Sequence, residues 1–174
     1  MPNWCENRIE ITGPRELISS IWDYATDEQT KSGLLDAMHP MPKELSGTTA
    51  PSDGGNWYTW RIQNWGTKWD IDSEGLEFID NEDGTACITG FAASAWSPPL
   101  EALSHFADAH EGVYAEVYYF EPGMAFVGSW DSAGVDDHYS YAECTSENLR
   151  EHIPEYLVDY FGLDGILTDW EEEE

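Results

Sequence analysis

The order of hydrophobic periods along the chain limits the fold more than any other feature of this sequence. Residues 7–12, NRIEIT, alternate between apolar and polar side chains, as a half-buried strand does. Residues 14–26 then place apolar side chains at helical spacing: Leu17, Ile18, Ile21, Trp22 and Ala25. Similar patterns recur downstream: LEFID and TACITGFAASAW flank the turn NEDG, residues 98–111 are helical, and VYAEVYYF and AFVGSW flank the turn EPGM.

The resulting order of strand, helix, strand, strand, helix, strand predicts an α+β fold with an antiparallel sheet and its helices on one face. It is the order of the split βαβ, ferredoxin-like sandwich. We expect that architecture, with an extra strand, for residues 1–135, which include an insertion at about 27–75. Residues 136–174 are expected to form an acidic C-terminal extension, packed on the same domain, whose helix is kinked or split at Pro154.

Charge is distributed unevenly along the chain. The formal net charge is -28, and residues 69–149 contain 17 acidic residues without a single lysine or arginine. Such a surface repels nucleic acid and anionic lipid, so we expect neither as a direct partner. It favours encounter with basic protein surfaces, although an acidic surface also simply keeps a protein soluble.

Residues 56–70, NWYTWRIQNWGTKWD, contain four of the nine tryptophans and two of the seven basic residues. On a helix they form an apolar stripe (Tyr58, Ile62, Trp65, Trp69) beside a cationic stripe (Trp57, Arg61, Asn64, Lys68), unless the helix breaks near Gly66. In one interpretation the apolar stripe packs on the sheet, while the two cations pair with carboxylates and lie across indole rings. In the other, the segment binds a small anionic ligand, with these candidate residues: Trp57, Arg61, Asn64, Trp65, Lys68, Trp69 and Trp96.

Several motifs resemble those of an uncharacterised protein family encoded by bacteriophages and conjugative plasmids. These are MPNWCENRIEITG at the start, NWGTKWD at 64–70, SAWSPP at 94–99 and YFEPGMAFVG at 119–128. The resemblance implies a ferredoxin-like domain and points to matching positions, without any catalytic role. The matching residues are Asn3, Trp4, Cys5, Asn7, Asn64, Trp65, Gly66, Thr67, Lys68, Trp69, Trp96, Ser97, Glu121 and Phe126.

The sequence gives little support for metal, cofactor or covalent chemistry. Asp70, Asp72 and Glu74 begin like a calcium-binding loop, but the twelfth position is Asn81 where such loops carry a bidentate glutamate. Three scattered cysteines cannot supply the four thiolates of an iron–sulfur cluster, and no histidine spacing singles out a nucleophile pair for Cys5. We therefore expect no catalytic residue, no metal and no cofactor.

These features predict a non-enzymatic accessory protein of a phage or plasmid in the cytoplasm of the bacterial host. Its acidic surface would mimic nucleic acid and block a basic host protein of defence or nucleic-acid handling. The candidate contact residues are Asp131, Asp136, Asp137, Glu143 and Glu147. Two alternatives stay open: a nucleotide-like ligand bound by the tryptophan-rich segment with Arg61 and Lys68, and an enzyme of unknown reaction. We expect no membrane association.

Overall fold

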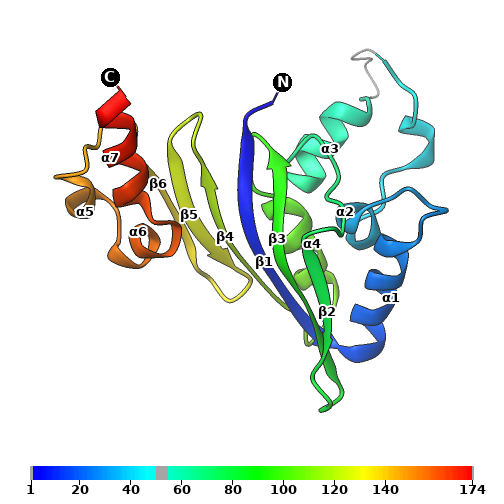
Figure 1. The fold of residues 1–174 in the computed structure, drawn as a ribbon. Helices are drawn as coiled ribbons and strands as arrows, with labels where there is room; N and C mark the ends of the chain where they lie inside the picture. Colours follow the sequence, from blue (N-terminus) through cyan, green and yellow to red (C-terminus); the bar gives the residue numbers. More distant parts are fainter. Residues whose placement is uncertain (1, 50–54, 174) are drawn as a thin grey trace.

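In the described residues, 2–49 and 55–173 of a computed structural model, six strands form one antiparallel sheet (Figure 1). The strands lie in the order β2-β3-β1-β4-β5-β6, which confirms the predicted α+β class with an antiparallel sheet. Their bounds are β1 Trp4–Pro14, β2 Leu76–Asp80, β3 Thr85–Ala95, β4 Tyr114–Glu121, β5 Phe126–Asp131 and β6 Asp136–Ser140.

One face of the sheet carries the main hydrophobic core. Ile9 and Ile11 of β1 point to this face and are fully buried, together with Ile18 of α1 (Arg15–Thr26) and Phe106 of α4 (Leu100–Ala109). Fully burying one such side chain stabilises the fold by about 1.5–3 kcal/mol. The two helices that the sequence predicts therefore pack on the same face, and the short helix α2 (Leu34–Met38) contacts both.

The insertion between α1 and β2 is held by the half-buried carboxylate of Asp70. It contains α2, the 3-10 helix η1 (Lys43–Leu45) and α3 (Trp57–Trp65). The Asp70 carboxylate accepts backbone N–H bonds from Gly33, Leu35 and Ile71 at 2.8 Å each, and from Asp36 at 3.3 Å. Burial raises the pKa of the Asp70 carboxyl, and these bonds oppose the rise. Asp70 therefore caps α2, as acidic groups do at helix N-termini.

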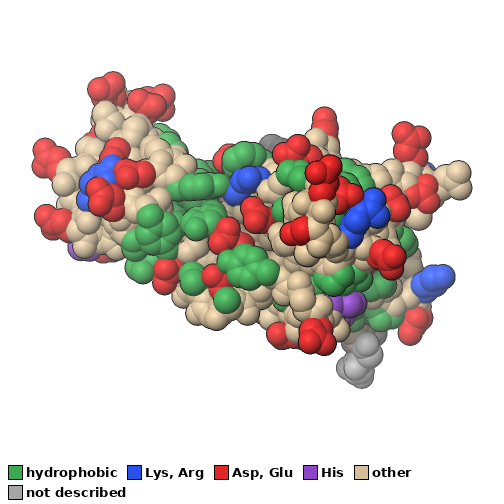
Figure 2. Space-filling view, turned by 90° about the horizontal axis from the view of Figure 1, so that it is seen from below, with side chains coloured by type: hydrophobic (Ala, Val, Ile, Leu, Met, Phe, Trp, Pro, Cys, Tyr) green, Lys and Arg blue, Asp and Glu red, His purple; other side chains and the backbone are tan. Residues whose placement is uncertain are grey.

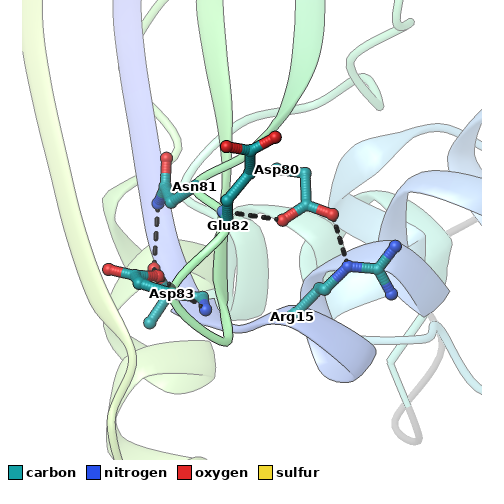
Figure 3. Close-up of polar contacts among 6 residues, drawn as sticks. Arg15, Asp80, Asn81, Glu82 and Asp83 are labelled. Atoms are coloured by element: carbon teal, nitrogen blue, oxygen red, sulfur yellow. Dashed lines mark hydrogen bonds and ion pairs between the residues drawn. The ribbon is translucent and has the colours of Figure 1, made fainter.

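The β2–β3 turn is fastened to the start of α1 (Figure 3). The Arg15 Nε lies 2.5 Å from the Asp80 Oδ2, and the backbone N–H of Arg15 donates to the Gly84 carbonyl at 2.9 Å. The other Asp80 oxygen accepts the Glu82 N–H at 3.0 Å, while Asp83 accepts the Thr85 N–H at 2.9 Å. The Arg15 guanidinium lowers the pKa of the Asp80 carboxyl. The ion pair is exposed, so its main effect is to set the geometry of the turn.

The C-terminal region forms a second core on the opposite face of the sheet. Residues 136–140, at the start of the predicted C-terminal extension, form the edge strand β6. Helices α5 (Leu149–His152), α6 (Glu155–Phe161) and α7 (Leu163–Glu173) follow, and the predicted break at Pro154 is confirmed. Their buried side chains pack against Phe120 of β4 and Val127 of β5. The one-sided helix arrangement therefore holds only for the helices before β4, and α5–α7 lie at the β5–β6 end of the sheet (Figure 1).

Candidate functional site

Three motif segments that are far apart in the sequence meet beside the N-terminal end of β1. The Trp96 N–H donates to the Asn3 carbonyl at 2.9 Å. The Thr67 hydroxyl donates to the carbonyl just before Trp96 at 2.9 Å, and the Ser97 hydroxyl donates to the Gly66 carbonyl at 2.5 Å. The motifs NWC, NWGTKW and SAWSPP thus form one junction, and their polar side chains are used to join the backbone segments.

Buried polar side chains of β1 and β3 connect to this junction by hydrogen bonds. The Asn7 Nδ2 donates to the Ser94 Oγ at 2.8 Å, and that hydroxyl donates to the Ser97 carbonyl at 2.6 Å. The buried Glu121 carboxylate accepts the N–H groups of residues 123 and 124 at 2.8 Å and 2.7 Å. Burial raises the pKa of the Cys5 thiol to about 12, which makes it a poor nucleophile. These motif residues therefore stabilise the fold.

The Lys68 ammonium lies among three aromatic rings of the protein itself. Its Nζ is 4.6 Å from the ring centre of Trp69, 5.3 Å from that of Trp96 and 5.7 Å from that of Tyr58. Trp96 has a backbone φ of 67°, a conformation that bulky residues rarely adopt. The lysine charge is thus stabilised by the faces of the rings that the sequence places around it.

Arg61 is held in the same way by the other rings of the segment. Its Cζ is 4.7 Å from the ring centre of Trp65 and 5.3 Å from that of Trp57. One Nη donates to the Lys68 carbonyl at 3.5 Å, whereas the Nε is buried without a hydrogen-bond partner. Burial lowers the pKa of Arg61. The guanidinium therefore retains unused donors.

Trp69 separates two hollows on this surface. A hollow of about 240 Å³ is lined by Met41, Ser46, Gly47, Trp57, Arg61 and Trp69. A second hollow, of about 340 Å³, is lined by Trp4, Trp69, Asp70, Ile71, Asp72, Ala92 and Ala93. Trp57 and Trp69 stack directly with ring centres 5.6 Å apart, so no planar ligand fits between them.

For the tryptophan-rich segment, the expected burial of the apolar stripe and the expected pairing of its cations with carboxylates are wrong, whereas the cations do lie over indole rings as expected. Helix α3 ends at Trp65, before Gly66 with its φ of 82°, so the predicted break near Gly66 is confirmed, and the main contacts of the helix are with α4. Of the expected apolar stripe only Trp65 is fully buried, while Tyr58, Ile62 and Trp69 are 42%, 36% and 40% exposed. Within the described residues neither Arg61 nor Lys68 forms a salt bridge, because rings occupy the positions expected for carboxylates. Asn64 donates to the carbonyl of Trp60 at 2.8 Å, within its own helix.

A stacked pair of histidines lies beside this segment. Sequence patterns could not predict the pair, because its two members are far apart along the chain. The rings of His39 and His105 lie with centres 3.6 Å apart and planes 10° apart. The His39 carbonyl accepts the Trp65 indole N–H at 2.9 Å, and its Nδ1 is buried without a partner. Burial, followed by the neighbouring His105, lowers the pKa of His39. These surroundings therefore favour the neutral form of His39.

A groove lies on the opposite face of the sheet, where α6 packs on β5 and its tyrosine side chains reach β4. It measures about 320 Å³ and is lined by Arg8, Glu10, Glu116, Tyr118, Tyr156 and Tyr160. We call it the tyrosine groove. Figure 2, seen from below, shows hydrophobic side chains, with acidic ones among them, between the C-terminal helices and the rest of the molecule. Phe91 of β3 is the direct partner of Arg8 on β1, and its side chain is 63% exposed.

The floor of this face carries three carboxylates in one row across three strands. Glu10 of β1 is the direct partner of Glu116 on β4, which in turn is the direct partner of Asp131 on β5. Directly paired residues of an antiparallel sheet point to the same face. The Tyr114 hydroxyl donates to both Glu116 and Asp131 at 3.2 Å. We call this set, Glu10, Glu116 and Asp131, the acid row.

The five acidic residues predicted as partner contacts do not form one patch. Asp131 lies in the acid row, and its carboxylate also accepts three backbone N–H bonds of the following turn. Asp137 lies on the same face and accepts the Tyr156 hydroxyl at 2.6 Å. Asp136 points to the other face, and Glu143 and Glu147 are exposed in the segment after β6. Only two of the five thus border the tyrosine groove.

Two searches of the described part of the chain give negative results. No group of three or more histidine, cysteine, aspartate or glutamate side chains in residues 2–49 and 55–173 lies close enough to hold a metal ion. No helix in that part is long and apolar enough to cross a membrane.

Comparison with known proteins gives one distant likeness. No protein-family model matches the chain, and no curated protein matches it. Among solved structures, the chain is similar to the crystal structure of protein Api92 from Yersinia pseudotuberculosis, a member of the family DUF1281. The match covers 82% of this chain and 99% of that chain, with 10% sequence identity and a TM-score of 0.47. At this level the likeness carries no argument about function.

Proposed function

We propose that this protein is a non-enzymatic binding protein that uses its acidic surface to bind a basic protein. The observation that carries the proposal is that most lysine and arginine side chains of the protein bind groups of the protein itself. Arg15 and Arg150 bind carboxylates, whereas Arg8, Arg61 and Lys68 lie over aromatic rings. Five of the seven basic residues are therefore held against the protein surface, and the negative charge dominates the outward field.

Few carboxylates are neutralised within the protein. In the described residues, salt bridges involve only four of them: Asp80, Glu155, Asp159 and Asp164. Three of these four surround the single guanidinium of Arg150. Unpaired carboxylates gain most from a partner whose lysine and arginine residues are already arranged to bind anions. A nucleic-acid-binding groove is such a surface.

We further propose that the protein is an accessory factor of a phage or plasmid that acts in the cytoplasm of the bacterial host. There it would occupy the basic groove of a defence or nucleic-acid-handling protein in place of nucleic acid. We infer that the first four strands with α1 and α4 belong to the ferredoxin-like class. The order β2-β3-β1-β4, with both helices on one face, supports this inference.

Capture of the partner under competition tests the proposed function. The full-length protein is immobilised and exposed to a bacterial lysate at low salt, at high salt, and at low salt with added duplex DNA. We expect a basic protein that is retained at low salt and released by both high salt and DNA. Retention of an acidic protein, or retention that neither salt nor DNA changes, would contradict the proposal.

A specific observation favours a second function, the binding of a small anionic ligand. The Arg61 Nε is buried without a partner beside the 240 Å³ hollow that Trp57 and Trp69 also line. An anion there would satisfy the unused guanidinium donors. Thermal unfolding with a panel of nucleotides and inorganic phosphate tests this function, with the Arg61→Lys variant as the control. A stabilisation that this variant loses would support it.

A further inference from the structure

The acid row concentrates negative charge on one face of the sheet. Glu10, Glu116 and Asp131 are consecutive partners across three strands, and none of them forms a salt bridge in the described part of the chain. Like charges directly opposite one another on a sheet are destabilising. A bound cation would relieve this repulsion, so the row gains from a positively charged occupant.

Arg8 of β1 lines the same groove, and its side chain is turned toward β3. Its Nη1 donates to the Thr89 hydroxyl of β3 at 2.7 Å, and its guanidinium lies 5.4 Å from the ring centre of Phe91. These contacts hold it toward β3, away from Tyr156 and Tyr160 of α6. The α6 side of the groove thus presents tyrosine rings, while Arg8 lies on the β3 side, where Thr89 is the direct partner of Glu10.

Aromatic rings form the wall above the acid row. Tyr118 of β4 stacks on Tyr160 of α6 with ring centres 4.8 Å apart, and Tyr156 meets Tyr118 edge-on at 6.4 Å. Tyr156 and Tyr160 are 43% and 44% exposed, so part of each ring is free to contact another molecule. Ring faces attract lysine and arginine cations, and guanidinium groups also stack on rings.

We propose that the tyrosine groove binds a lysine or arginine side chain of the partner, with arginine preferred. The guanidinium would stack on Tyr156 or Tyr160 and donate hydrogen bonds to Glu10 and Glu116. This inference rests on the proposed function, because it names the contact through which the basic partner is anchored. Charge complementarity selects this occupant: the lining contains Glu10, Glu116 and one arginine, and the adjacent Asp131 adds a further negative charge.

Calorimetric titration with an arginine nonapeptide tests the inference. The reference probe is the same peptide with citrulline, which keeps the shape of arginine without its charge. The variants are Glu10→Gln with Glu116→Gln in one chain, and separately Tyr160→Ala. The matched control is Glu6→Gln, because Glu6 lies on the same strand and face as Glu10, opposite Phe120.

We expect the wild-type protein to bind the arginine peptide and not the citrulline peptide. The double glutamine variant and Tyr160→Ala should each weaken binding by about tenfold, because charge-assisted hydrogen bonds and ring contacts are each worth roughly that much. Glu6→Gln should bind nearly as well as the wild type. Circular dichroism establishes that each variant is folded, and the glutamine variants keep the shape of the groove.

The outcomes separate this inference from the proposed function. If the wild type binds the arginine peptide and both groove variants bind it as tightly as Glu6→Gln does, the groove is not the anchor, while the proposed function stands. If the wild type does not bind the arginine peptide, both proposals fail. Equal binding of the citrulline peptide would also overturn the inference, because the groove would then recognise shape without charge.

Discussion

Glu10 and Glu116 are direct partners on the neighbouring strands β1 and β4, and their side chains point to the same face of the sheet. Two carboxylates in this relation repel each other, and a fold optimised only for stability would avoid them. Proteins retain destabilising arrangements of this kind where the surface binds a ligand. The pair is therefore the point at which stability and binding are expected to oppose each other.

Replacement of Glu10 by glutamine should stabilise the protein while it weakens the binding of a basic partner. Removal of one charge from the pair should raise the free energy of unfolding by about 0.2–1 kcal/mol. Urea unfolding of Glu10→Gln, measured beside Glu6→Gln, checks this, since Glu6 faces Phe120 and lacks an acidic partner on β4. Equal stability of Glu10→Gln and Glu6→Gln would show that the pair is not repulsive.

Loss of the Lys68 ammonium should destabilise the fold. In Lys68→Ala the rings of Tyr58, Trp69 and Trp96 lose their cation, which should lower the free energy of unfolding by about 0.5–2 kcal/mol. Lys43→Ala is the matched control, because no ring contact involves that lysine in the described residues. Urea unfolding followed by tryptophan fluorescence measures both variants, and equal midpoints would contradict the role of the rings.

Asp70→Asn should be more damaging than the same change at Asp72. The Asp70 carboxylate accepts four backbone N–H bonds with two oxygens, whereas an asparagine side chain offers one acceptor oxygen. Buried donors left unpaired should cost about 1–3 kcal/mol of unfolding free energy. Asp72 accepts a single N–H bond, from Glu74, and is exposed, so Asp72→Asn serves as the control in thermal unfolding.

The histidine pair predicts a loss of stability in mild acid. An unperturbed histidine has a pKa of about 6.5. Burial and His105 lower the pKa of His39 in the folded state, so below about pH 6.5 the unfolded chain takes up a proton that the folded protein resists. Stability should therefore fall as pH decreases from 7 through 6.5 toward the folded pKa. Urea unfolding at several pH values should show a shallower fall in His39→Gln, and parallel curves would contradict the assignment.

Local patterns along the sequence predict much of this fold. The helix expected at 14–26 is α1, and the helix expected at 98–111 contains α4, because both have long apolar faces at helical spacing. The strand β6 could not be predicted in this way. Its sequence, DDHYS, is polar on both faces, as is common for a strand at the edge of a sheet. The strand is formed by its pairing with β5, which no local pattern contains.

The candidate sites depend on contacts that no local pattern contains. The rings around Lys68 come from α3, from the chain after Gly66 and from Trp96 beyond β3, so periodicity could suggest a contact with indole rings but not which rings surround the cation. The acid row needs the register of β1, β4 and β5, since Glu10, Glu116 and Asp131 lie far apart along the chain. The predicted contact residues are close together in the sequence, but the structure distributes them over β5, both faces of β6 and the segment after β6.

The most direct test compares the acidic surface with the tryptophan-rich segment in a single titration. Calorimetry with the arginine nonapeptide is performed on Lys68→Ala and on a variant that combines Asp136→Lys, Glu143→Lys and Glu147→Lys. These three carboxylates are exposed, and no hydrogen bond to them is found in the described chain, so their reversal should leave the fold intact.

The account predicts that the reversed variant binds the peptide more weakly and with a smaller salt dependence, because the attractive field is reduced. Folded Lys68→Ala should bind as the wild type does. A folded Lys68→Ala variant that loses binding, beside a reversed variant that keeps it, would contradict the account and assign function to the tryptophan-rich segment.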